Sequence, residues 1–153
     1  MNQHIENILK TRLYILDQIK DLSVDQLNKM PEGMGNNIVW NLGHIVAAAQ
    51  GSCYFRSGVP MIINDTFWNT YKPGSRPEHF IDKNEIEVIK QLLISSMARF
   101  QEDYQNNIFS GYKTWTSRYG VEMQNIDDAI RFLMFHEGYH GGAISVLKKL
   151  VIK

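Results

Sequence analysis

Apolar residues recur along the chain at steps of three and four, which is the spacing of one face of an α-helix and not of a strand. Four segments show this pattern, and no internal repeat or low-complexity stretch interrupts them. In the first segment the apolar stripe consists of Ile5, Ile8, Leu9, Leu13, Leu16 and Ile19. Ser23 and Gln26 then have the spacing of a capping box. They predict a short helical turn that ends near Pro31 and Gly33.

The second helix is expected to begin after Asn36 or Asn37, because either side chain can cap it, and to run to about Gly58. The segment from Ile38 to Phe55 is apolar nearly all round, with few charges to mark a solvent-facing side. Such a helix is buried on several sides or lies at a subunit contact. A homodimer is therefore one expectation for this chain.

Two further amphipathic helices follow. Asp82 and Glu85 form a second capping box, which opens a helix that ends at about Asn106. Its apolar stripe consists of Ile86, Ile89, Leu93, Met97, Phe100 and Tyr104. The last helix begins near Asn125, and one of its sides carries Ala129, Leu133, Ala143, Leu147 and Leu150. Four such helices predict an all-α fold, a four-helix bundle that forms a single domain over residues 1–153.

The connections between helices two and three and between helices three and four are long. They span residues 59–81 and 107–124, whereas connections in bundles usually have ~2–8 residues. Their aromatic residues are Phe67, Trp68, Tyr71, Phe109, Tyr112, Trp115 and Tyr119. Loops of this length often cover a functional site; alternatively, these aromatics only cap the ends of the bundle. The segment from Tyr112 to Val121 is also a candidate for a short extended piece.

Composition and charge exclude several classes of partner. Sixteen Lys and Arg residues balance sixteen Asp and Glu residues, and the basic residues are scattered except at the C-terminal end. A nucleic-acid or acidic membrane partner is therefore not expected.

The single cysteine, Cys53, cannot form an internal disulfide. With no secretory leader and no apolar run of the ~20 residues that a membrane span needs, we expect a cytoplasmic protein.

Residues His136 to His140 match the H-E-x-x-H pattern, in which two histidines one helical turn apart bind a metal ion. In zinc proteases the third ligand lies downstream, but no His, Asp, Glu or Cys follows His140. The protease interpretation therefore fails. Burying two imidazoles without partners costs free energy, and a shared metal ion removes that cost.

A third ligand has to come from upstream. At ~100° per residue, His136 and His140 lie on the core-facing side of the last helix, and His44 lies on an inward-facing side of the second. His44 can therefore join the pair if these two helices are neighbours; considered alone, it is more often a core residue. Cys53 lies on the opposite side of its helix from His44, and His4 and His79 are expected to be solvated.

Other residues near the histidines have two interpretations each. Glu137 points toward the edge of the histidine face, so it is either an acid–base candidate or a solvated surface residue. Arg12 lies on the apolar face of the first helix, where it either binds an anionic substrate or extends to solvent. Gly138, Gly141 and Gly142 weaken a helix, which suggests that a backbone, side chain or ligand comes close to them.

Taken together, these segments resemble the DinB-like superfamily. The run Trp40-Asn41-Leu42-Gly43-His44-Ile45 looks like the family's "W-x-L-x-H-I" second helix. The run Phe135 to Ile144 looks like its "H-E-x-x-H-x-G-x-I" fourth helix. Where this chain has Gly141 and Ala143 the family often has Arg and Gln, which puts in doubt any polar role at those positions.

The resemblance implies a four-helix bundle, often dimeric, in which His44, His136 and His140 hold a divalent ion. Zinc or nickel is the first expectation, followed by iron or manganese. Trp40 and Tyr139 are the candidates for lining a pocket around the ion. Characterised members of the family include metal-dependent transferases that use low-molecular-weight thiols and a thiol-dependent isomerase.

Three functions follow as hypotheses. The first is a metal-dependent enzyme that acts on a small molecule, with a thiol as co-substrate, in detoxification or the stress response. The second is a non-enzymatic, stress-associated protein with a structural metal ion. The third is a metal-dependent hydrolase, which differs from the first in needing no thiol. No catalytic residue beyond the candidate Glu137 is assigned.

Overall fold

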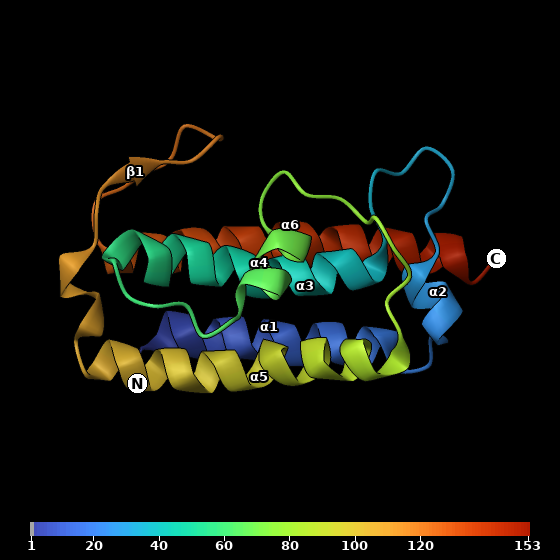
Figure 1. The fold of residues 1–153 in the computed structure, drawn as a ribbon, viewed down its shortest axis with the longest axis horizontal. Helices are drawn as coiled ribbons and strands as arrows, with labels where there is room; N and C mark the ends of the chain where they lie inside the picture. The colour runs from blue at the N-terminus through green and yellow to red at the C-terminus, as the bar shows by residue number, and fades with distance from the viewer. Residues whose placement is uncertain (1) are drawn as a thin grey trace.

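The computed structural model describes residues 2–153 and is predominantly helical. The four long helices are α1 (Gln3–Ile19), α3 (Ile38–Ala49), α5 (Lys83–Gln105) and α6 (Ile126–Val151). In Figure 1 they run alongside one another in two layers, α1 with α5 and α3 with α6. Each long helix packs against two others, so that α1, α6, α3 and α5 close a four-sided bundle. The predicted all-α four-helix bundle is confirmed.

Local sequence signals set the helix ends. The side chain of Ser23 accepts a hydrogen bond from the backbone N–H of Gln26, and the side chain of Gln26 accepts one from the backbone N–H of Ser23. These two bonds complete the predicted capping box of α2 (Val24–Asn28). Asn37, Asp82 and Asn125 cap α3, α5 and α6 with one bond each, in which the side chain accepts from the backbone N–H three residues further on; for Asp82 this is the first of the two bonds of the predicted capping box. These polar caps satisfy backbone N–H groups in the first turn of each helix and therefore favour helix starts at these positions.

The second predicted helix continues beyond α3 in a changed form. Residues Gln50–Tyr54 form one π-helical turn and Phe55–Ser57 a 3-10 turn, before Gly58 ends the run with a φ of 70°. All of α3 is buried, because α2, α4 (Asp65–Tyr71), α5 and α6 pack around it. The apolar character of this helix is thus explained within one chain, and a subunit contact is not needed to account for it.

The two long connections are partly structured. The first holds α4, which packs on α3, and the second holds a 3-10 turn (Ile108–Gly111) and a two-stranded antiparallel hairpin. In the hairpin, β1 (Trp115–Thr116) pairs with β2 (Glu122–Met123), with Trp115 opposite Met123. The extended piece expected between Tyr112 and Val121 therefore includes β1. None of the helices described has both the length and the apolarity that a membrane span needs.

A polar layer divides the core of the bundle into two apolar clusters. One cluster includes Ile15, Ile45 and Leu93, and the other includes Ile8 and Met97. Between them each of α1, α5 and α6 contributes a buried polar side chain: Arg12, Ser96 and Glu137. On α1 the buried face carries Arg12, whereas Leu13, which was predicted to lie in the apolar stripe, is 49% exposed.

Gly43 lets α4 lie directly on α3. A Cβ at this position would overlap the ring of Tyr71, which is the last residue of α4. Gly43→Ala is therefore expected to lower the free energy of unfolding by about 1–3 kcal/mol, because either the Tyr71 ring or the whole of α4 must move. Gly142→Ala is the matched control, since there an added Cβ meets no described atom within 4 Å. Urea denaturation of both variants measures the difference, and equal effects would contradict this account.

Candidate metal centre

His44, His136 and His140 converge between α3 and α6. One ligand nitrogen from each lies within 4.8 Å of the other two, and His44 Nε2 is 3.2 Å from His136 Nε2. All three side chains are buried, with 5%, 9% and 7% of their surfaces exposed. The three side chains face inward as helical spacing predicts, and they meet because α3 and α6 are neighbours in the bundle.

Hydrogen bonds on the outer side of two rings fix which nitrogen faces inward. His44 Nδ1 lies 2.8 Å from the carbonyl oxygen of Tyr71, so Nδ1 must donate and Nε2 keeps its lone pair. His140 Nδ1 lies 2.7 Å from Asn41 Oδ1. The Asn41 amide nitrogen donates to the carbonyl oxygen of Asn37, which leaves Oδ1 as the acceptor for His140. Partners of this kind orient metal-binding imidazoles.

The inward-facing nitrogens suit a shared cation. His44 Nε2 and His140 Nε2 both present lone pairs, and the His136 Nε2 that faces them can donate one proton only. His136 Nδ1 is buried with no hydrogen-bond partner among residues 2–153. A divalent ion that accepts the three inward-facing lone pairs would satisfy that side of the cluster, and neutral imidazole is a common ligand of such ions; His136 Nδ1 lies outside this set. The residues present therefore fit a bound metal ion.

Burial keeps the three rings neutral. Desolvation lowers the pKa of His136 to about 2 and that of His140 to about 3, and it also lowers the pKa of His44. The other histidines of the cluster add to the first two shifts, because like charges repel. Ligands that are already deprotonated do not have to lose a proton when a metal ion binds.

A cavity of about 400 Å³ opens beside the three histidines. Trp40 and Tyr139, the two predicted lining residues, both line it. The Trp40 ring stacks on His44 with 4.6 Å between centroids, and its Nε1 donates to Ser75 Oγ. The remaining lining residues are Asn36, Ala48, Ser52, Pro73, Gly74, Ser75, Trp115, Ser117, Arg118, Tyr119 and Phe132. Both long connections thus contribute to the wall.

A comparison with models of known protein families assigns the chain to one of them. The family model of the DinB superfamily matches residues 8–144, which is nearly the whole chain. The chain belongs to the DinB superfamily. A search of curated proteins found no match.

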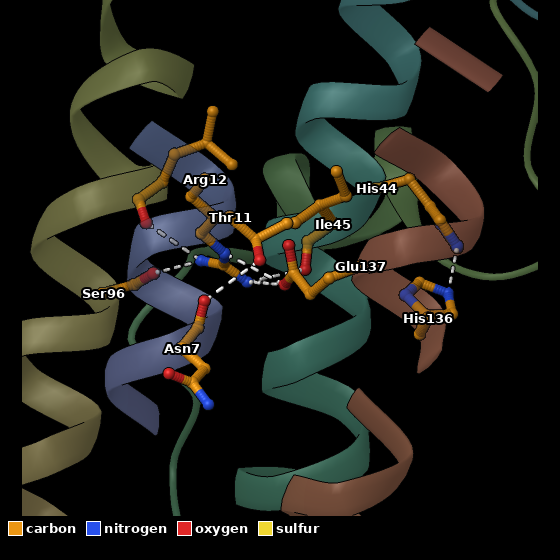
Figure 2. A network of polar contacts seen from close by, with 9 residues as sticks. Asn7, Thr11, Arg12, His44, Ile45, Ser96, His136 and Glu137 are labelled. Carbon is orange, nitrogen blue, oxygen red and sulfur yellow. Dashed lines mark hydrogen bonds and ion pairs between the residues drawn. The ribbon is translucent and has the colours of Figure 1, made fainter. Parts of the chain in front are cut away.

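In this DinB protein Glu137 does not belong to the cavity, and it is not solvated. Its side chain is 1% exposed and accepts from Arg12 Nε at 3.0 Å and Nη2 at 2.6 Å. Figure 2 shows this pair beside Ser96, on the other side of α6 from the contact between His44 and His136. The surface interpretation of Glu137 was wrong because α1 covers the edge of the histidine face. A direct acid–base role for this carboxylate has no support in its position.

Arg12 is likewise fully buried, so the expectation that it extends to solvent was wrong. Besides Glu137 it donates to the carbonyl oxygens of Leu93 and Ile45 and to Ser96 Oγ. These partners lie on α3, α5 and α6, so one guanidinium joins α1 to the other three long helices. Arg12 does not line the cavity, and an anionic substrate there would not reach it.

Other described parts of the protein come close to only one of the three glycines of α6. A Cβ at Gly138 or Gly142 would meet no described atom within 4 Å, and one at Gly141 would lie 3.5 Å from Ile15 Cδ1. At Gly138 and Gly142 no backbone or side chain of the described residues therefore comes close, and both glycines line a cavity of about 230 Å³, where the ligand that the sequence also allowed stays a prediction. No contact within the described residues explains why glycine stands at these two positions.

The remaining ligand candidates lie away from the cluster. Cys53 is fully buried in the apolar core, and desolvation raises the pKa of its thiol. His4 and His79 are exposed, as predicted.

Two residues around the site were not predicted from the sequence. Asn41 could have been found as a lone amide on an otherwise apolar helical face. No local pattern distinguishes Arg118 from other loop arginines.

Proposed function

We propose that this DinB-superfamily protein is a metal-dependent enzyme that transfers a low-molecular-weight thiol to an electrophilic small molecule. The observation that carries the proposal is the position of the three histidines, which lie together in the wall of an accessible cavity. Catalytic metal sites keep coordination positions open in this way, whereas structural sites are closed by four protein ligands. Zinc and nickel are the proposed ions, and detoxification is the proposed context.

In the proposed reaction the metal ion activates the thiol, and the residues of the chain position the reactants. His44, His136 and His140 would hold the divalent ion, which would supply Lewis acidity that lowers the pKa of a thiol in the cavity. The sulfur lone pair forms the new S–C bond while the leaving group departs with its bonding electrons, and the thiol proton passes to solvent. No carboxylate among the described residues lines the cavity to take up that proton.

The chain's own residues position the reactants. Asn41 and the Tyr71 carbonyl hold two of the rings with their Nε2 atoms facing the cavity side. The rings of Trp40, Phe132 and Tyr139 form apolar walls that accommodate the electrophile and reduce its contact with water. Glu137 and Arg12 act from within the bundle by fixing α6 against α1.

The proposal is tested with protein loaded with zinc or nickel, common bacterial thiols and a panel of alkyl and aryl halide electrophiles. We expect a thioether product, detected by mass spectrometry, that requires both metal and thiol. His136→Ala should reduce turnover by about 100-fold or more, since metal-ion catalysis is worth several kcal/mol. His79→Ala is the control, because His79 is an exposed histidine outside the cavity.

Three outcomes would contradict thiol transfer. Product without added thiol would indicate hydrolysis instead. No product with any thiol, together with a large fall in thermal stability on chelation, would indicate a structural ion. No metal binding at all would remove the basis of the proposal.

A further inference from the structure

The cavity beside the histidines carries an unbalanced positive charge. Among its described lining residues Arg118 is the one with a permanent charge, since no Lys, Asp or Glu lines the cavity. The other polar groups there are the neutral side chains of Asn36, Ser52, Ser75, Ser117 and the two tyrosines. A divalent ion at the cluster would add further positive charge to the same space. A ligand that complements this cavity has to bring negative charge.

Arg118 is held at the cavity by a tight hairpin turn. Ser117 N–H donates to the Val121 carbonyl oxygen and Gly120 N–H donates to the Ser117 carbonyl oxygen, both at 2.9 Å. Gly120 has a φ of 77°, a conformation that favours glycine and allows the chain to reverse here. The turn therefore fixes the backbone on both sides of Arg118.

The neighbouring aromatic residue holds the guanidinium itself. Arg118 Cζ lies 5.1 Å from the Tyr119 ring centroid, and Nη2 donates to the Tyr119 hydroxyl at 3.1 Å. The Tyr119 ring packs edge-on against Phe135, with 5.2 Å between centroids, and lies near Tyr139. The side chain of Arg118 is thus supported by α6, the helix that supplies two of the three histidines.

The side chain of Arg118 is exposed, and protein groups take up little of its hydrogen-bonding capacity. A guanidinium has five N–H donors, and within residues 2–153 Arg118 forms one hydrogen bond and no ion pair with a carboxylate. An arginine with this geometry can bind a carboxylate or phosphate through paired hydrogen bonds.

We propose that Arg118 binds the anionic group of the thiol or of its acceptor, so that the substrates of this site are small carboxylate- or phosphate-bearing molecules. This inference rests on the proposed function, in that the anion is placed while the sulfur or electrophilic carbon lies at the histidine cluster. Arg118 is a specificity-determining residue here, and it takes no part in the bond changes.

Binding measurements on metal-loaded protein test this inference apart from catalysis. The probes are 3-mercaptopropionate and its uncharged methyl ester, with succinate and succinamide as a thiol-free pair. Wild-type protein should bind each anion at least about tenfold more tightly than its neutral partner, since hydrogen bonds to a charged group are stronger than those between neutral groups. Calorimetry or competition with a chromophoric ligand gives the dissociation constants.

Arg118→Gln should remove the preference for the anions and leave the affinity for the ester and the amide within about twofold. Arg118→Lys should restore part of the preference, because it keeps the charge but not the planar pair of donors. Arg131→Gln is the matched control, since Arg131 lies on α6 outside the cavity and pairs with Asp128. It should change neither affinity.

The outcomes separate the two proposals. If Arg118→Gln leaves the anion affinities unchanged, or weakens acid and neutral probe equally, the inference about Arg118 is overturned even where thiol transfer is observed. Equal binding of acid and neutral probe by the wild type overturns it as well. If no thiol transfer occurs but succinate still binds through Arg118, the proposed reaction fails while anion recognition stands.

Discussion

His136→Ala is expected to weaken divalent-metal binding by about 100-fold or more and to reduce the metal content of the purified protein from about one ion per chain to a small fraction. The reason is that His136 supplies one of the three converging nitrogens, 3.2 Å from that of His44. Loss of an outer partner already costs about 10–100-fold in metal affinity, so loss of a ligand costs at least as much. Elemental analysis of protein prepared without a histidine tag, with titration against a chromophoric chelator, measures both quantities.

Matched variants make this result interpretable. His79→Ala and His4→Ala remove exposed histidines and should bind metal like the wild type. Asn41→Ala leaves all three ligands but removes the acceptor of His140 Nδ1, so a loss of about 10–100-fold is expected. His136→Gln, which keeps most of the side-chain volume, guards against a folding defect in the alanine variant. Full metal content in a folded His136 variant would show that the cluster is not the binding site.

Arg12→Leu is expected to lower the free energy of unfolding by about 3–5 kcal/mol, the largest stability effect that we predict for this chain. The substitution leaves the Glu137 carboxylate buried without its partner, and breaking a buried ion pair in this way is strongly destabilising. Burial already raises the pKa of Glu137, because desolvation outweighs the attraction of the guanidinium. Chemical denaturation with a two-state analysis gives the free energy.

The double variant Arg12→Leu with Glu137→Leu separates the cost of an unpaired charge from the cost of losing the pair. Because both charges are removed, it should recover much of the lost stability. It should also retain metal binding, since neither residue lies in the cavity. Arg131→Leu, which breaks an exposed pair with Asp128, should cost less than about 1 kcal/mol. An Arg12→Leu variant that loses no more than Arg131→Leu would refute a structural role for the buried pair.

Much of the fold could be predicted from the sequence because the signals that set the helices are local. The asparagine and aspartate caps and the apolar spacing depend on residues within a few positions of one another, so they placed the starts of α3, α5 and α6 correctly. The three candidate metal ligands could be predicted for a related reason. His136 and His140 share a helix face by spacing alone, and the apolar face of α3 indicated that His44 points inward.

The environment of each polar residue was decided by tertiary structure. Helical spacing gives the angle of a side chain about its own axis but not the identity of the helix that covers that side. Glu137 was therefore assigned to an edge, whereas α1 brings Arg12, 125 positions away in the chain, into contact with it. The Tyr71 carbonyl that orients His44 depends in the same way on the packing of α4 against Gly43.

The sequence by itself thus determined the helices, their caps and the inward direction of three histidines, because these follow from contacts within single segments. The packing of separate segments determined the polar layer inside the bundle, the outer partners of the rings and the cavity wall that contains Arg118. Such contacts join positions that are distant in the chain, and no periodicity within one segment encodes them.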